Sequence, residues 1–276
     1  MDARAFAQLY PHEAYERANA NGVRFDGRPF ARARAVACAR TKEEDEKMGD
    51  VSGGAVAKRG HTTAIARAIV KAIEIHDERD DQGRVRCDIT RANTCDEERI
   101  FGKMKEDDAR MRECASVVER CVDLESLCVE RGVSGWEVKV DVVILDDDGA
   151  ASDCALVAAV GALMDCELPR TPNERGEGER EGVRRVVMKH IPVCLTSALY
   201  RGHVLVDPTA EEEALSRCLV SVIVDEFGSL HGVFKHGGEV EATEDTLMKC
   251  IAAAKLHYAA TKKVIDDAAG GTLDDE

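Results

Sequence analysis

A carboxylate directly after an apolar strand, with more acidic residues close behind, is the pattern in this sequence with the clearest chemical potential. Asp207 follows the apolar run 204–206, and Glu211, Glu212 and Glu213 follow after three intervening residues. Carboxylates so placed could hold a divalent cation or act as a general acid. The same residues would also suit a turn and the acidic start of a helix. The spacing alone favours this structural interpretation.

Arginines between residues 77 and 108 form a second feature that could contact a charged ligand. Four of them could bind nucleic-acid phosphates, namely Arg84, Arg86, Arg91 and Arg99. Acidic residues are interleaved with them, namely Asp88, Asp96, Glu97 and Glu98. The mixture of signs favours a solvated surface over a basic binding track.

Three further motifs lack residues that their chemistry requires. Gly176 and Gly178 follow no clear strand and have no Lys-Ser/Thr pair after them, which is typical of a flexible linker rather than a phosphate loop. In the run 146–149 the glycine stands too early for a calcium loop, and position twelve would be Val157, which cannot ligate. None of the eight histidines stands beside a serine or cysteine in a nucleophile motif. The residues alone give no complete catalytic constellation.

The composition limits the partners that the surface can bind. Of 276 residues, 44% are hydrophobic and 33% are charged, which is typical of a soluble globular protein. Lys and Arg number 38 against 53 for Asp and Glu, so the net charge is −15. Such a surface repels RNA, DNA and membranes on average, and any contact with nucleic acid must be local or shared with a more basic partner.

Cysteine usage and the amino terminus predict an intracellular protein. The 11 cysteines include no Cys-x-x-Cys pair and no cysteine–histidine cluster at metal-ligand spacing, so we expect buried, reduced thiols and no bound metal. The first residues carry charges and no apolar run, which predicts no secretory signal. No stretch approaches the roughly 20 apolar residues of a membrane span. We expect the protein in the cytoplasm or nucleus.

Hydrophobic periodicity predicts the elements that must position these residues. In the first part of the chain it predicts a helical arm over residues 1–24 and strands over 31–40, 54–75 and 136–144. The strand 54–75 is expected to turn at 58–62 as a hairpin, but its many alanines leave a helix over 63–72 open.

Between these strands the sequence predicts a long surface excursion over 77–108 and a helix over 106–131. Ser152 is expected to cap the next helix, in which residues 155–164 are apolar on every side and therefore buried.

The second part of the chain repeats this plan after a break. Prolines and glycines among alternating charges make residues 169–184 the linker candidate. Strands are expected over 186–188, 191–195, 204–206, 218–224 and 230–234, and a final helix over 243–268. Strands followed by helix in each half predict an α+β fold. The expected division is an arm (1–24), a first half (25–168), a linker (169–184) and a second half (185–276).

Four motifs, taken in order, resemble the RNase PH-like family. Arg24–Arg28 is similar to the family's Arg-x-Asp-Gly-Arg signature, and Gly53–Thr62 to its strand, turn and strand. Asp141–Gly149 resembles the strand and turn before the family's buried helix. Leu205–Glu213 is the sharpest match and is similar to the non-catalytic ring subunits of the eukaryotic RNA exosome. Each motif is weak alone, but their order, which runs on to the final helix, is specific, whereas residues 77–108 match poorly.

The resemblance implies an RNase PH fold, made of two related halves of the ribosomal protein S5 domain 2-like type. It implies a place in a ring of RNase PH-like proteins, topped by RNA-binding cap subunits, through which RNA is threaded to a separate nuclease. Such a subunit would support rRNA maturation and mRNA turnover in the nucleus, including the nucleolus, and in the cytoplasm, without a cofactor. Arg99 is the candidate contact to RNA.

Active members of the family are phosphate-dependent 3′-to-5′ exoribonucleases, and two of their features are altered here. They hold phosphate with a Gly-Thr-Arg-Ser/Thr-like loop, whereas Gly149–Ser152 of this chain lacks the arginine. They carry two aspartates six residues apart, whereas this chain has Asp207 and then Glu213. The acidic run 146–148 would further repel phosphate.

The resemblance therefore implies a subunit with no catalytic residues, in which Asp207 and Glu213 are a degenerate remnant. The alternative is an active phosphorolytic exoribonuclease, alone or in a composite site with a partner subunit.

Overall fold

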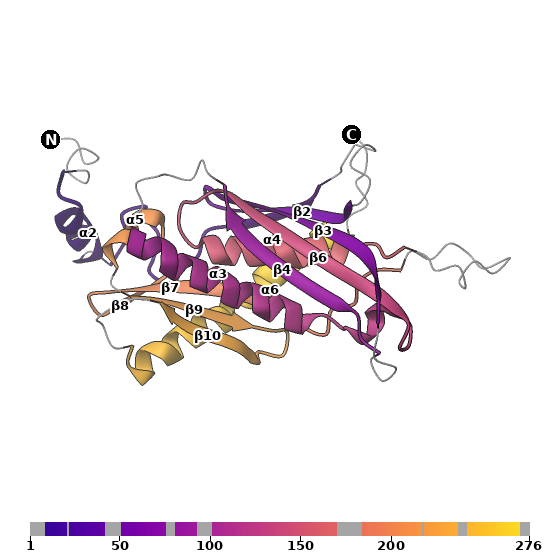
Figure 1. Ribbon diagram of the computed structural model, residues 1–276. Helices are drawn as coiled ribbons and strands as arrows, with labels where there is room; N and C mark the ends of the chain where they lie inside the picture. The colour runs from indigo at the N-terminus through magenta and orange to yellow at the C-terminus, as the bar shows by residue number, and fades with distance from the viewer. Residues whose placement is uncertain are drawn as a thin grey trace.

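Helices lie between two β-sheets in the computed structural model of the chain, as Figure 1 shows. The structure describes residues 9–20, 22–41, 51–75, 81–92, 101–169, 184–216, 218–236 and 242–270. Three helices, namely α3 (Phe101–Cys121), α4 (Ala151–Asp165) and α6 (Glu244–Gly270), each contact strands of both sheets. The core therefore sits between the sheets and around these helices.

The first sheet has the strand order β1-β2-β3-β6-β4, with β5 paired to β6. Its strands are β1 (Val36–Arg40), β2 (Val51–Arg59), β3 (Thr62–Glu74), β4 (Arg84–Arg91), β5 (Cys128–Glu130) and β6 (Ser134–Asp146). Neighbouring strands are antiparallel except β4, which runs parallel to β6.

The second sheet is antiparallel with the order β10-β9-β7-β8. Its strands are β7 (Val193–Tyr200), β8 (His203–Val206), β9 (Cys218–Val224) and β10 (Leu230–His236). The remaining elements are α2 (Pro11–Ala20), a single 3₁₀ turn η1 (Glu125–Leu127) and the short helix α5 (Ala210–Leu215). The α+β fold expected from the sequence is confirmed.

Strand β3 is rich in alanine because small side chains are needed where helix α4 packs closely against the sheet. Ala64, Ala66 and Ala68 are fully buried on alternate positions of β3, which packs against α4. A Cβ on Gly53 of the neighbouring strand would lie 2.6 Å from the Ala162 carbonyl oxygen of α4. The hairpin of β2 and β3 is therefore confirmed, and a helix over 63–72 is excluded.

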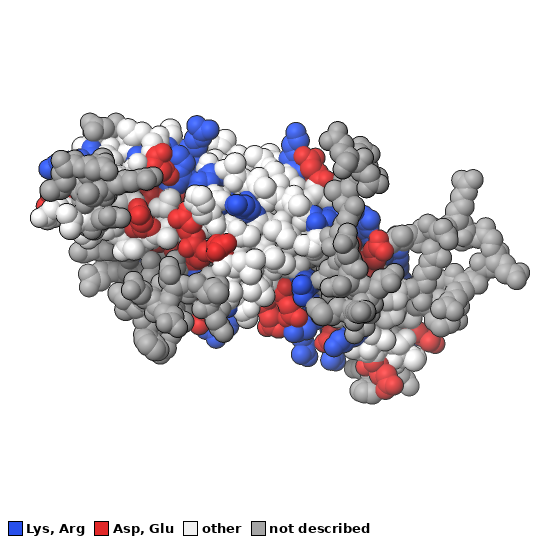
Figure 2. All heavy atoms as spheres, turned by 90° about the horizontal axis from the view of Figure 1, so that it is seen from above, with Lys and Arg blue, Asp and Glu red and all other residues white. Residues whose placement is uncertain are grey.

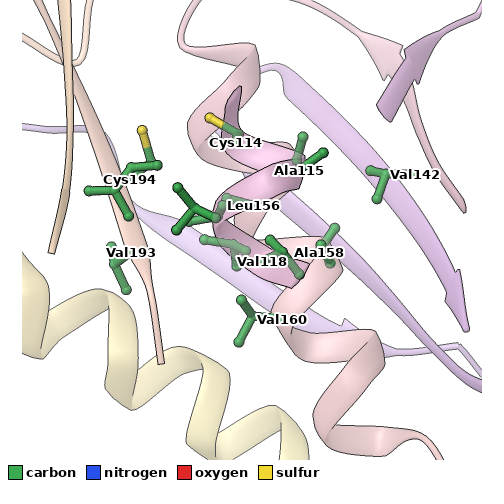
Figure 3. Packing of buried hydrophobic residues seen from close by; sticks show 14 of the residues in the cluster. Cys114, Ala115, Val118, Val142, Leu156, Ala158, Val160, Val193 and Cys194 are labelled. Carbon is green, nitrogen blue, oxygen red and sulfur yellow. The ribbon is translucent and has the colours of Figure 1, made fainter. Parts of the chain in front are cut away.

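Helix α4 is the centre of the core, as predicted. Figure 3 shows its apolar side chains meeting those of α3, β6 and β7. The residues labelled there are Cys114, Ala115, Val118, Val142, Leu156, Ala158, Val160, Val193 and Cys194. Each of them is buried. The described cysteines are free thiols, and all except Cys38 and Cys128 are buried. No helix in the described ranges is long and apolar enough to span a membrane.

The surface excursion predicted for 77–108 is partly wrong, because it contains strand β4. Val85, Cys87 and Ile89 turn toward the core, while the charged residues between them are exposed. This alternation is the period-two pattern of a strand with one solvated face, and the sequence analysis overlooked it because the segment around it is highly charged.

Three further boundaries differ from the predictions. Helix α3 ends at Cys121 rather than near residue 131, because the chain there turns to pair Val122 with Met188. That pairing is an isolated bridge, so the strand expected over 186–188 is not formed. Ser152 does not cap α4 but lies buried in its first turn, after Ala150 at a left-handed φ of 51°.

Candidate functional site

The sequence-predicted carboxylates meet three other segments where β8 ends and α4 begins. Asp207 follows β8, and α5 carries Glu211, Glu212 and Glu213. Residues 24–34 and the loop 146–150 are close enough to form hydrogen bonds to this region. We call the set of Asp207, Glu212 and Glu213 with Arg24, Arg28, Arg34 and Arg59 the carboxylate junction.

Asp207 is enclosed by arginines. Its side chain is fully buried, and its Oδ2 accepts hydrogen bonds from the Arg34 backbone N (2.7 Å) and Nε (2.9 Å) and from Arg28 Nη1 (3.1 Å). Its Oδ1 accepts from Arg34 Nη2 at 2.8 Å. Burial alone would raise the pKa of Asp207, but the Arg34 hydrogen bonds and the charges of Arg59 and Arg34 hold it below its usual value. The ionised form of Asp207 is thus favoured, and both of its oxygens accept hydrogen bonds.

Arg34 joins three parts of the chain through one guanidinium. Besides Asp207, its Nη1 donates to the Asp148 carbonyl oxygen at 2.8 Å, and its Nη2 donates to the carbonyls of Gly149 and Pro208, each at 3.2 Å. Gly149 must be glycine here, because its φ is 85° and a Cβ would lie 2.4 Å from the Pro208 carbonyl oxygen. The loop before α4 is therefore pressed against the start of α5.

Glu212 is the partner of Arg24. Both side chains are buried, and Arg24 donates from Nε to Glu212 Oε1 at 2.8 Å and from Nη2 to Oε2. Arg24 also donates to the carbonyls of Val206 (2.7 Å) and Asp207 (2.9 Å). Glu212 completes a capping box with Thr209, which is why the acidic run begins a helix.

Glu213 occupies the amino terminus of α4. Its side chain is buried, and its Oε1 accepts a hydrogen bond from the Ala150 backbone N at 2.8 Å. The first backbone N–H groups of a helix lack partners within the helix and attract anions. A carboxylate from the second sheet's side of the molecule therefore stands where a phosphate or another anion would be held.

Asp153 and Arg59 extend the junction into the core. The Asp153 carboxylate, on α4, accepts from the Thr196 backbone N (2.8 Å) and Oγ1 (2.6 Å) on β7. Arg59 lies between Asp153 (3.8 Å) and Asp207 (3.9 Å), buried and ion-paired to both. Its charge is therefore balanced from two elements.

Family profiles match both parts of the chain. Domain 1 of the 3′ exoribonuclease family matches residues 40–169, and domain 2 of the same family matches residues 190–255. The chain belongs to the 3′ exoribonuclease family. The two matched segments contain β2 to α4 and most of the second sheet with part of α6.

Named relatives of this 3′ exoribonuclease family chain are exosome components. It is 27% identical over 243 residues to exosome complex component Rrp42 of Methanocella arvoryzae, an alignment that covers 86% of this chain and 88% of that protein. It is 34% identical over 160 residues to exosome complex component RRP45A of Arabidopsis thaliana, covering 54% and 52%. A chain in the structure of the Archaeoglobus fulgidus exosome with RNA bound to the active site superposes with a TM-score of 0.72 at 22% identity, covering 91% and 96%. That superposition confirms the RNase PH fold.

The names of the relatives indicate an exosome component and do not select one particular subunit. The motifs of the sequence predict exosome component eight in particular, and the matching relatives, named Rrp42 and RRP45A, do not test that finer assignment.

The predicted basic residues do not form a track in the part of the chain that the structure describes. Arg91 pairs with Asp147, and Arg86 Nε lies 3.3 Å from Glu137 Oε1. Arg99 lies outside the described residues. Figure 2 shows one face of this family member, on which basic and acidic side chains are interspersed around a broad uncharged area.

The sequence analysis missed the arginines and the polar core residue that complete the junction. Arg34 and Arg59 stand in ordinary turn and strand contexts, and Asp153 stands in the first turn of a helix, where the helix dipole already favours an acidic residue. A buried aspartate in an otherwise apolar helix was the one available signal, because such a charge requires a partner.

Proposed function

We propose that this chain is a ring subunit of an RNA exosome core and does not itself catalyse phosphorolysis. The observation that carries the proposal is the Glu213 carboxylate at the amino terminus of α4, the place where active family members would hold phosphate. The names of its relatives and the RNA-bound exosome with the same fold support the ring assignment.

The local electrostatics oppose phosphate at this helix. An incoming phosphate would meet the buried Glu213 anion, and like charges a few ångströms apart in a low dielectric repel strongly. Ala151, at the position of the family's arginine, is 5% exposed and leaves little room for a cation. Asp147 and Asp148 are paired with Arg91 and Arg34. Repulsion therefore comes from Glu213 more than from the acidic run expected to cause it.

Asp207 supports the same conclusion. A catalytic or metal-binding carboxylate needs a free lone pair toward the substrate, yet both oxygens of Asp207 accept arginine N–H groups. Asp207 and Glu213 therefore serve as structural groups. They join the end of β8 and helix α5 to the segment before β1 and to the start of α4.

The partners of the proposed subunit are other RNase PH-like ring subunits, cap subunits and RNA passing through the assembled ring. Arg99 as an RNA contact, the division at 25–168, 169–184 and 185–276, and a location in nucleus, nucleolus and cytoplasm stay predictions. A fluorescent fusion expressed from the native promoter tests the location.

Assembly is tested by purifying the tagged chain from its native cells at moderate salt and identifying the retained proteins by mass spectrometry. The proposal expects a near-stoichiometric set of distinct RNase PH-like proteins and cap proteins. Recovery of this chain alone as a homo-oligomer would contradict the ring assignment.

Catalysis is tested on the same purified complex with Glu213→Gln and, as the matched control on the same helix, Glu211→Gln. Glu211 is exposed and accepts from the Tyr15 hydroxyl, away from α4. Neither change should alter the phosphate-dependent release of nucleoside diphosphates from RNA. If Glu213→Gln abolished that release while the complex still assembled, the chain would be an active phosphorolytic subunit, alone or in a composite site.

A further inference from the structure

Two histidines and an aspartate meet at one end of the second sheet, in a cluster that the proposed function does not use. Asp225 directly follows β9, and His231 is the second residue of β10. The turn between these strands is closed by hydrogen bonds between Asp225 and Ser229. His190 precedes β7, whose first residue, Val193, pairs with Val224. The sheet register therefore brings the three residues together.

Their ligand atoms are spaced as around a single metal ion. His231 Nε2 lies 3.0 Å from Asp225 Oδ2, and His190 Nδ1 lies 3.4 Å from the same oxygen. The three ligand atoms all lie within 4.8 Å of one another. Zinc binds nitrogen and oxygen at about 2.0–2.2 Å in a tetrahedron, which places its ligand atoms about 3.3 Å apart.

The carboxylate is fixed before any ion arrives. Asp225 Oδ1 accepts hydrogen bonds from the backbone N of Phe227 (2.9 Å) and of Ser229 (2.7 Å). The Asp225 side chain is 1% exposed, and its Oδ2 points to both imidazoles. Such outer hydrogen bonds are how metal sites orient their ligands.

One of the two imidazoles is left unsatisfied by the protein alone. His231 Nε2 and Asp225 Oδ2 can form a hydrogen bond, but His190 Nδ1 is buried and has no hydrogen-bond partner among the residues that the structure describes. Glu226 Oε1 lies 3.8 Å from that nitrogen, and Glu226 Oε2 accepts from the Ile191 backbone N. A purely hydrogen-bonded cluster leaves a buried polar atom orphaned, whereas a cation would satisfy it.

We propose that His190 Nδ1, Asp225 Oδ2 and His231 Nε2 bind a zinc ion, with Glu226 or water as the fourth ligand. Two imidazoles and a carboxylate form a donor set that zinc binds, and the charge of the ion would be balanced by Asp225 and Glu226. Cys121 Sγ lies 3.7 Å from the other ring nitrogen of His231, so it would touch the ligand and not the ion.

The ion would have a structural role at the boundary between helices and sheet. The carbonyl of Cys121, at the end of α3, accepts from the backbone N of Lys189 and His190. Zinc would thus tie the end of α3 to the β9–β10 hairpin, which also pack together directly (Figure 1).

The test is metal binding by the purified full-length chain after removal of metals with a chelator. Titration with Zn²⁺ should show one zinc ion bound tightly per chain, and the bound ion should raise the melting temperature. Co²⁺ should give the visible bands of a tetrahedral site without a sulfur-to-cobalt charge-transfer band, which separates this site from adventitious binding to the cysteines.

Variants locate the site. His190→Gln removes no hydrogen bond that holds the fold, and it should lower the affinity for Zn²⁺ at least about tenfold, as should His231→Gln. His203→Gln, at an exposed histidine elsewhere in the same sheet, is the matched control and should bind like the wild type. Cys121→Ser should retain binding. Absence of a tight equivalent in the wild type, or equal binding by His190→Gln and wild type, would overturn the proposal.

Discussion

Replacing Asp207 with asparagine should destabilise the chain far more than the same change at an exposed carboxylate that shares a partner with it. Four arginine N–H groups donate to Asp207, three of them to Oδ2. Asparagine offers one acceptor oxygen, and its amide NH₂ would face N–H donors. At least two charge-assisted bonds are therefore lost, each worth roughly 1.5–3 kcal/mol, and Arg28, Arg34 and Arg59 each lose one of their two carboxylate partners. The expected loss in the free energy of unfolding is about 3–5 kcal/mol.

Asp26→Asn is the matched control, because Asp26 also pairs with Arg28 but is 35% exposed. An exposed pair of this kind contributes about 0.2–1 kcal/mol. Urea unfolding at pH 7, followed by circular dichroism and by the fluorescence of the single tryptophan, Trp136, measures both variants. If Asp207→Asn lost no more stability than Asp26→Asn, the arginine enclosure would not be the stabilising contact argued here.

The pH dependence gives an independent check of the same carboxylate. The pKa of Asp207 is held below its usual 3.8 in the folded chain, so folding favours the ionised form. Its contribution is complete above the unfolded pKa and is lost as the pH falls through the lowered folded pKa. The stability difference between wild type and Asp207→Asn should be constant from about pH 5 to 8 and shrink below about pH 4. A difference that shrinks already near neutrality would contradict this assignment.

Three further changes probe the core. Thr196→Val removes the 2.6 Å hydrogen bond to the buried Asp153 and should cost about 1.5–3 kcal/mol in chemical unfolding. Gly53→Ala places a Cβ 2.6 Å from an α4 carbonyl and should lower stability by about 1–3 kcal/mol, whereas Gly270→Ala, with nothing within 4 Å, should stay within about 0.5 kcal/mol. Burial raises the pKa of Cys154 to about 12, so at pH 8 its thiolate fraction is small, and alkylation detected by mass spectrometry should be slow until the chain is unfolded in urea.

The predictable part of the fold was the part fixed by local pattern. Alternation over 136–144 indicated β6, and the all-round apolar segment 155–164 indicated the buried helix α4, because each pattern reports burial directly. Strand β4 was not predicted although its apolar and charged residues alternate, because the pattern is short and lies in a highly charged segment. The alanines of β3 were ambiguous because what selects the strand is the close approach of α4, which is a tertiary contact.

The site was predictable in its residues and not in its partners. Asp207 drew attention by its position after a strand, and Glu213 by the resemblance to the family. Arg34, however, lies 173 positions from Asp207, and the α4 amino terminus lies 63 positions before Glu213. Similarly, His190 and Asp225 carry no motif and meet only because β7 pairs with β9. Spacing along the chain cannot report such pairs.

The polar contacts of the junction share one geometric property, and it bears on what the chain does. Ala150 with Glu213 and Thr196 with Asp153 join α4 to the side of the second sheet. Arg34 with Asp207 and Arg24 with Glu212 tie the segment before β1 to the end of β8 and to α5. Directional buried bonds of this kind set relative position more than they add net stability. A subunit whose edges contact its neighbours benefits when these bonds hold the parts of the chain in one relative position. An enzyme would instead need the amino terminus of α4 and the carboxylates to be open to substrate. This arrangement is the one we expect of the proposed ring subunit.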